Sequence, residues 1–212
     1  MKWPNILSHG NRYATVEDVR KIFADYHDTL HWLARFLLTD EVLAPACVVD
    51  ACNIAERQSP MFHDWLTHWA AHATLLCALR MQRDDVAALV PKYEQLDGVD
   101  SDRPLFSPED LQLLVDNAEV VRTQLDVLCR FVLIMYGIGK ETREDVGSQL
   151  RLSESAVVRA YAVAFDTFRR VSVKTATNAN KAGPSGGILD RLHHLFEGIH
   201  RLGQESAEPN KK

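Results

Sequence analysis

Residues 142–168 constrain the fold more than any other part of this chain, because their apolar spacing fits two short helices joined by a tight turn. Thr142, followed three residues later by Asp145, is typical of a helix start, and Ser153 can cap the second helix. The apolar face of the first helix is Val146, Gly147 and Leu150. This arrangement is typical of the helix-turn-helix, whose second helix lies in the major groove of DNA.

The second helix has one apolar face and one mixed face. The residues expected to face inward recur with helical spacing and are Val157, Tyr161, Ala164, Phe165 and Phe168. The residues expected to face outward are Ser155, Val158, Arg159, Ala162 and Asp166. Arg159 can form two hydrogen bonds with a guanine edge, and Ser155 can bond a base or a phosphate. The predicted DNA-contacting residues are Arg143, Arg151, Ser153, Ser155, Val158, Arg159 and Ala162. The alternative is a helical hairpin that packs on its neighbours without touching DNA.

The whole chain has the pattern of an all-α protein. Helical periodicity dominates its 212 residues, and the alternating apolar runs typical of strands are missing. A hydrophobic content of 46% and a charged content of 25% indicate a globular chain. No apolar run approaches the roughly 20 residues of a membrane-spanning helix, and the first residues lack the apolar core of a signal peptide. We therefore expect a cytoplasmic protein without a membrane partner.

Charge is unevenly distributed along the chain. The formal net charge of -5 argues against a protein that coats nucleic acid indiscriminately. Residues 84–126 contain eleven acidic and three basic residues, whereas residues 140–174 contain seven basic and five acidic ones. Only the neighbourhood of the helix-turn-helix pattern is therefore mildly basic.

The sequence predicts two small helical domains. The predicted segments are a helical domain over residues 14–83, an acidic linker over 84–107, a helix-turn-helix domain over 108–172, a flexible linker over 173–187 and an amphipathic helix over 188–203. Pro91, Gly98 and the acidic composition suit a linker better than a core element. Ser107, followed by Pro108, predicts the start of a helix. The C-terminal helix is either a lid on the second domain or a partner-binding helix.

Periodicity in the first domain predicts helices over residues 16–26, 26–38, 45–57 and 65–80. The last of these has an apolar stripe of Leu66, Trp69, Ala70, Ala73, Leu76 and Cys77. Exposed aromatic rings could stack on unpaired bases, and the candidates are Trp32, Phe36, Phe62, Trp65 and Trp69. Helical spacing with leucines favours core packing for them instead.

The usual motifs of catalysis are missing from the sequence. It has no Gly-rich phosphate loop, no Gly-x-Ser-x-Gly elbow and no Cys–His pairing, so we expect neither an enzyme nor a cofactor. Its four cysteines, which have no paired spacing, are expected to be buried thiols: Cys47, Cys52, Cys77 and Cys129. His68 and His72 stand four residues apart, with His63 nearby, but the glutamate of a zinc protease helix is missing. We predict no metal site, and a helical metalloenzyme is the third alternative for function.

The chain resembles the extracytoplasmic-function sigma factors, the two-domain initiation subunits of bacterial RNA polymerase. Phe62, Trp65, Leu66 and Ala70 match the family's Phe-x-x-Trp-Leu-x-x-Ile-Ala helix. Residues 145–157 match its Glu-Ile-Ala-x-x-Leu-Gly-Ile-Ser-Glu-Gly-Thr-Val motif at the apolar and capping positions. The resemblance implies a first domain that binds polymerase and opens promoter DNA, and a second domain that reads promoter DNA. It also implies a polymerase contact by the helix over residues 45–57, at Val48, Val49, Asp50 and Asn53.

The sequence departs from the family at the residues that carry its chemistry. The family's Lys-Ser-Arg-x-x-Arg run becomes Val158, Arg159 and Ala160, followed by Val163. Each lost phosphate contact removes about one counterion's worth of salt-dependent affinity, so we expect weak DNA binding without polymerase. The leading hypothesis is a sigma-like initiation protein whose partners are core polymerase and promoter DNA. The alternative is a decoy or adaptor that binds polymerase or an anti-sigma protein without specific DNA binding.

Overall fold

The computed structural model describes residues 13–57, 62–99, 103–178, 188, 191, 192 and 194 of the chain. The protein is all-helical, as the sequence predicts, and the described residues contain no strand. The first half consists of α1 (Val16–Asp25), α2 (His27–Leu37), η1 (Glu41–Leu43), α3 (Ala44–Arg57), η2 (His63–Trp65), α4 (Leu66–Met81) and α5 (Arg83–Glu94). The second half consists of α6 (Pro108–Asp116), α7 (Ala118–Gln124), α8 (Val127–Val132), the π-helical turn η3 (Leu133–Ile138), α9 (Arg143–Leu150) and α10 (Glu154–Asn178).

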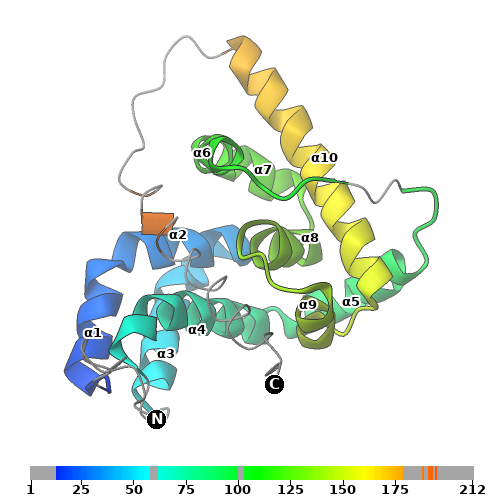
Figure 1. The fold of residues 1–212 in the computed structure, drawn as a ribbon. Coiled ribbons are helices and arrows are strands. Elements are labelled where there is room, and N and C mark those ends of the chain that lie inside the picture. The colour runs from blue at the N-terminus through cyan, green and yellow to red at the C-terminus, as the bar shows by residue number, and fades with distance from the viewer. Residues whose placement is uncertain are drawn as a thin grey trace, which may run out of the picture.

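Helices α1 to α4 form a small bundle at one side of the molecule (Figure 1). The α4 helix is buried on more than one face, because Ala71, Thr74 and Leu75 are buried in addition to most of the predicted stripe. Leu76 was expected in that stripe, but its side chain is exposed. Small alanine side chains on α4 allow its neighbours to approach closely, so the helix lies in the middle of the bundle.

The predicted acidic linker begins as a helix, so the linker prediction is wrong for its first part. Residues 83–94 form α5, in which Val86 and Tyr93 are buried. The Tyr93 hydroxyl donates a hydrogen bond to Oδ2 of Asp126 (2.7 Å) and lies 2.9 Å from Sγ of Cys129. The acidic composition therefore marks the solvent face of a helix that is anchored on α8.

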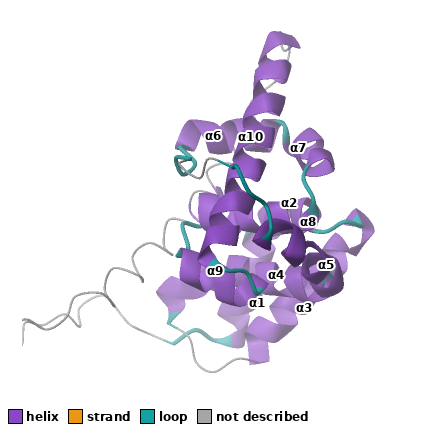
Figure 2. Ribbon diagram, turned by 90° about the vertical axis from the view of Figure 1, so that its right-hand side faces the viewer, coloured by secondary structure: helices purple, strands orange, loops and turns teal. Residues whose placement is uncertain are grey.

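The helix starts of the second half follow their predicted caps. Ser107 accepts a hydrogen bond from the Asp110 backbone, and Pro108 occupies the first turn of α6. Thr142 caps α9 in the same way by accepting from the Asp145 backbone. Helix α10 is longer than expected, because residues 173–178 of the predicted flexible linker continue it. Its C-terminal part projects beyond α6 and α7 (Figure 2).

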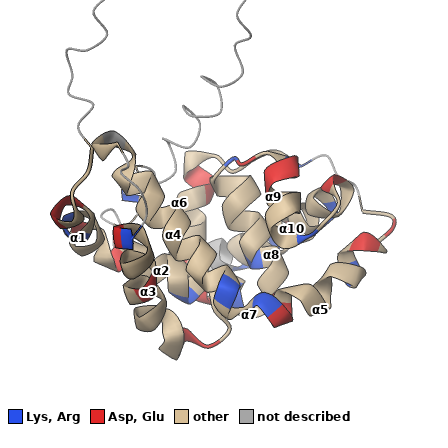
Figure 3. Ribbon diagram, turned by 90° about the horizontal axis from the view of Figure 1, so that it is seen from below, with Lys and Arg blue, Asp and Glu red and all other residues tan. Residues whose placement is uncertain are grey.

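The two halves share one continuous hydrophobic core. Arg130 of α8 is only 5% exposed, and its Nη1 donates to the carbonyl oxygens of Phe36 (3.1 Å) and Leu38 (2.9 Å) at the end of α2. Burial lowers the Arg130 pKa to about 10. Around α7, acidic and basic residues lie close together (Figure 3), and the ion pairs there join Arg35, Glu41, Glu119 and Arg122. The halves are thus joined by packing and by polar contacts.

The predicted C-terminal helix lies mostly outside the described residues, and the described ones contact the first half. Leu192 is fully buried, and Ile188 packs against the core. Arg191 donates to the carbonyl oxygen of Asp25 (2.6 Å) and lies over the ring of Tyr26. These contacts favour docking at the α1–α2 junction over a lid on the second half.

Two further predictions concern chemistry and membranes. All four cysteines are free thiols; Cys47, Cys77 and Cys129 are buried and Cys52 is half-buried. Burial raises the pKa of the Cys47 thiol to about 12, so it is protonated at neutral pH. Each helix in the described part of the chain is too short or too polar to cross a lipid bilayer.

Candidate nucleic-acid interface

Helices α9 and α10 are joined by the three residues 151–153, as the sequence pattern predicts. Arg151 ends α9 with a left-handed backbone (φ 58°). Gly147 is required for the close approach of the turn, because a Cβ atom there would lie 2.7 Å from the carbonyl oxygen of Leu152. Ser153 caps α10 by accepting from the backbone N–H of Ala156 (3.2 Å).

The inward face of α10 is confirmed, but its predicted outward face is wrong at two residues. The five predicted inward residues are all buried, with exposed fractions of 7% or less. However, Val158 is only 7% exposed and Ala162 is fully buried. Both were expected to face DNA. Helix α10 is therefore buried on more than one side, and α5 is among the helices that contact it.

Arg159, the residue expected to read a guanine edge, is bound to the end of α5. Its Nε donates to the carbonyl oxygen of Tyr93 (2.9 Å), and its Nη2 donates to that of Glu94 (3.1 Å). Carbonyl groups at a helix C-terminus lack partners within the helix and carry partial negative charge, which favours a guanidinium there. The Arg159 side chain is 20% exposed. In this conformation Nε and Nη2 of Arg159 are therefore bound to the protein itself.

Ser153 is also held by α5. Its backbone N–H donates to Oε1 of Glu94 (2.6 Å), and its hydroxyl donates to Oε2 (2.7 Å). These hydrogen bonds lower the pKa of the Glu94 carboxyl. The predicted DNA-contacting residues that remain exposed are Arg143, Arg151, Ser153 and Ser155.

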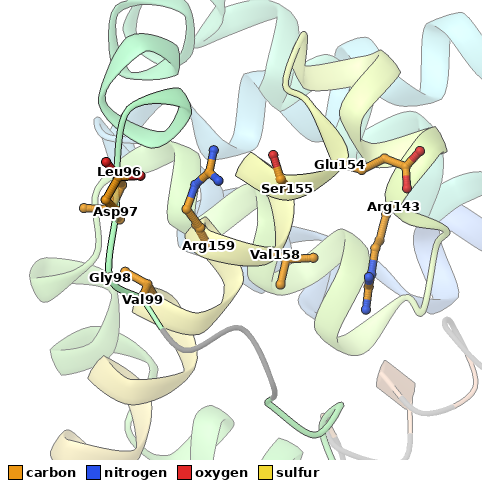
Figure 4. A pocket seen from close by; sticks show the side chains of 9 residues that line it. All are labelled: Leu96, Asp97, Gly98, Val99, Arg143, Glu154, Ser155, Val158 and Arg159. Carbon is orange, nitrogen blue, oxygen red and sulfur yellow. The ribbon is translucent and has the colours of Figure 1, made fainter.

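A pocket of about 390 Å³ brings four of the predicted residues together (Figure 4). Its predicted lining residues are Arg143, Ser155, Val158 and Arg159. Sequence reasoning missed the other wall, formed by Leu96, Asp97, Gly98 and Val99, and it missed Glu154 at the start of α10. Figure 4 shows Arg159 between Ser155 and the 96–99 segment, with Arg143 and Glu154 at the other end. Two arginines face two acids here, so the pocket has no dominant charge.

The turn before α9 contains a half-buried acid, Glu141. Burial raises the pKa of the Glu141 carboxyl to about 7, although Nε2 of Gln149 donates to it (3.1 Å). Arg143 lies beside it in sequence and donates to the Tyr136 hydroxyl (3.2 Å). Glu141 therefore changes its charge near neutral pH, close to the start of α9.

Helix α3 presents a different surface. Val49, Asp50 and Asn53 are accessible as expected for a polymerase contact, although Asp50 lies 3.4 Å from Arg80 in an ion pair. Val48 was expected there too, but it is 5% exposed and faces the core. Sequence reasoning missed Val42, which is 79% exposed at the start of the same surface. An exposed stripe results from the helical spacing of Val42, Pro45, Ala46, Val49 and Asn53. We call these five residues the α3 stripe.

The histidine pair and the aromatic residues do not form a site of their own. His63, His68 and His72 are half-buried, and the described residues contain no group of three His, Cys, Asp or Glu side chains placed to hold a metal ion. Phe36 is buried and stacks on Trp32 (5.5 Å between centroids), as core packing predicts. Trp65 was also expected in the core, but it is 42% exposed.

No protein-family model matches the chain, and no curated protein or solved structure is significantly similar to it.

Proposed function

We propose that this protein is a sigma-like transcription initiation protein, which binds core RNA polymerase through the α3 stripe and brings α9 and α10 to promoter DNA. The observation that carries the proposal is the α3 stripe itself. The sequence resemblance assigns polymerase binding to this helix, and the structure leaves an apolar surface uncovered there.

The α3 stripe has the composition of a protein-binding surface. Val42 and Val49 are 79% and 59% exposed, and Pro45 and Ala46 lie between them on the helix. Each exposed aliphatic side chain gains about 25 cal/mol per Å² when a partner removes it from water. Asp50 and Asn53 border the apolar residues, as polar groups border the apolar centre of a typical interface.

The DNA-binding part of the proposal is supported by what remains accessible on α9 and α10. Arg143 and Arg151 are exposed at the two ends of α9, and Ser155 is exposed in the first turn of α10. Arginines at such positions suit the phosphate backbone, which positions a protein on DNA. With few cations, the contact needs the effective concentration that a polymerase tether supplies.

A decoy or adaptor is the second candidate, and the closed face of α10 favours it. Val158 and Ala162 are buried, and Arg159 is bound to α5. A protein that kept this conformation would bind polymerase, or an anti-sigma protein, without reading DNA.

The α3 stripe is tested by the double variant Val42→Asp/Val49→Asp. Two buried carboxylates in the interface should weaken binding to core polymerase about 100-fold, which corresponds to about 2.7 kcal/mol. Both valines are exposed, so the thermal unfolding temperature should stay within about 2 °C of the wild type. The control is Val120→Asp/Val173→Asp, which places the same charges on exposed valines of α7 and α10. If both double variants bind polymerase as the wild type does, the proposed function is wrong.

Transcription with reconstituted polymerase separates the two candidates. An initiation protein should start transcripts from selected promoters, whereas a decoy should only compete with another initiation subunit. A gel-shift assay at low salt is a second test, because tight sequence-selective binding to DNA would contradict the decoy function.

A further inference from the structure

We propose that the C-terminal part of α10 binds the phosphate backbone of duplex DNA through Arg169, Arg170 and Lys174. We call these three residues the basic end of α10. The proposal rests on the proposed function, because it assigns a DNA contact of α10 to the end of the helix opposite Ser155. It adds a surface that binds DNA of any sequence, since contacts to phosphates carry no sequence information.

The basic residues of α10 are concentrated late in the helix. Residues 154–168 contain one basic and two acidic residues, whereas residues 169–174 contain three basic residues and no acid. The whole chain has a formal net charge of -5, so the basic end differs in sign from the protein as a whole. Positive charge of this kind is what attracts a protein to the phosphates of DNA.

The three basic side chains lie on the solvent side of α10. Arg169, Arg170 and Lys174 are exposed, whereas Phe168 and Val171 are buried. Residues four positions apart on a helix lie one above the other, so Arg170 and Lys174 share a face. Both side chains can therefore reach the same strand of a duplex.

Two of the three cations have no partner among the described residues. Neither Arg170 nor Lys174 forms an ion pair or a side-chain hydrogen bond there. Asp166 lies one turn before Arg170, but both of its carboxylate oxygens accept hydrogen bonds from Arg103, at 2.8 and 2.9 Å. A phosphate can therefore bind Arg170 and Lys174 without replacing a contact within the described protein.

Arg169 is the exception in the basic end. Its Nη1 donates to Oδ1 of Asp110 (2.8 Å), and its side chain is 54% exposed. An exposed ion pair is weak, because water competes for both partners. Arg169 can thus exchange this carboxylate for a phosphate at small cost, and Arg170 and Lys174 supply most of the contact.

The dipole of α10 does not account for these basic residues. A basic side chain stabilises a helix when it lies in the last turn, and the effect falls off within that turn. Helix α10 ends at Asn178, and its last turn contains no basic residue. The positions of Arg170 and Lys174 therefore call for another explanation, which an external anion supplies.

The start of α10 is less suited to a phosphate contact. Arg159 is bound to the end of α5, and Val158 and Ala162 are buried. Glu154 is exposed in the first turn and would repel a phosphate. The C-terminal part, in contrast, projects beyond α6 and α7 (Figures 1 and 2). A duplex can therefore approach the basic end without displacing a described helix.

The test is the double variant Arg170→Gln/Lys174→Gln in the full-length protein. Glutamine removes the two charges and is as good a helix former as the residues that it replaces. The matched control is Arg57→Gln/Arg83→Gln, which removes two exposed cations from the first half. Fluorescence anisotropy with a labelled duplex of arbitrary sequence, at salt concentrations from about 20 to 200 mM, measures affinity and its salt dependence.

We expect a weaker salt dependence in the Arg170→Gln/Lys174→Gln protein. Each phosphate contact contributes about -0.9 to the slope of log affinity against log salt concentration, so loss of two contacts should make the slope less negative by about 1.8. The affinity at about 50 mM salt should fall about tenfold to a hundredfold. The control should keep the wild-type slope.

A charge-preserving variant separates loss of charge from loss of structure. Arg170→Lys/Lys174→Arg should keep the wild-type slope, because phosphate contacts of this kind depend on charge. The unfolding temperature of both variants should stay within about 2 °C of the wild type, since the two side chains are exposed.

Four outcomes would overturn the proposal. They are an unchanged slope in the Arg170→Gln/Lys174→Gln protein, an equal change in the control, a wild-type protein that does not bind the duplex at the lowest salt, and loss of polymerase binding with DNA binding intact. The last outcome would show that the basic end contacts a protein. Failure of the proposed function is recognised separately, because the α3 stripe variant is tested for polymerase binding without DNA.

Discussion

Helix α3 and the outward face of α10 were both predicted to contact a partner, but the structure leaves part of the first surface exposed and buries part of the second. Val42 in η1 and Val49 in α3 are exposed, and α3 packs through its other face. On α10, Val158 and Ala162 are buried beneath the protein's own chain, and Arg159 is bonded to α5. A partner can therefore bind the exposed face of α3 directly. A partner of the outward face of α10 must first replace contacts that this face makes within the protein, such as those of Arg159 with α5.

The largest expected effect comes from the same substitution at the two surfaces. Val158→Asp places an unpaired carboxylate in a nearly buried site, next to Glu154, and should lower the free energy of unfolding by about 3 kcal/mol. Val49→Asp, on the α3 stripe, should change it by less than about 0.5 kcal/mol. Urea unfolding measures both values. Equal losses of unfolding free energy in the two variants would contradict the finding that Val158 is buried and Val49 is exposed.

A smaller effect is expected from Glu141, the half-buried acid before α9. The folded-state pKa of Glu141 is about 7, above the ordinary glutamate value of 4.5, so the folded protein binds this proton more tightly than the unfolded chain does. The contribution of this group to stability is therefore greatest below about pH 4.5 and is lost as the pH rises through 7. Glu141→Gln should flatten this dependence and raise the stability at pH 8 by about 1 to 2 kcal/mol.

The control for this measurement is Glu144→Gln, which alters an exposed acid of α9 and should keep the wild-type pH dependence. Thermal unfolding between pH 4.5 and 8 gives the comparison. A wild-type slope in the Glu141→Gln protein would show that this carboxyl is not the group responsible.

The smallest effect concerns the ends of α9 and α3. Arg151 has a left-handed backbone that costs a non-glycine residue about 1 kcal/mol, so Arg151→Gly should raise the stability by about 0.5 to 1 kcal/mol. Arg57→Gly, in the last turn of α3, should lower it by about 0.5 kcal/mol, because glycine is a poor helix former. Chemical denaturation of the two variants measures the change in the free energy of unfolding. A change of the same sign in both variants would contradict the left-handed backbone at Arg151.

Helix starts and buried stripes could be predicted from the sequence because both depend on nearby residues. Ser107 and Thr142 cap the helices that they were expected to cap, and Val157, Tyr161 and Phe168 face the core. The linker was predicted less well, because α5 is acidic on its solvent face and its two buried residues give little periodicity. Tyr93 becomes a core residue only through its contact with Asp126, which is 33 residues away.

The sequence alone determined that the chain is helical, where most of its helices begin, and which side of α10 faces inward, since these features depend on caps and on spacing of three or four residues. The tertiary structure alone decided what lies on the other side of α10. The groups that bind Arg159 there are backbone carbonyls 65 and 66 residues away, and every residue carries such a group, so no side-chain pattern could reveal them. On α3 no such segment packs against the second side among the described residues, and the valines of the α3 stripe remain exposed.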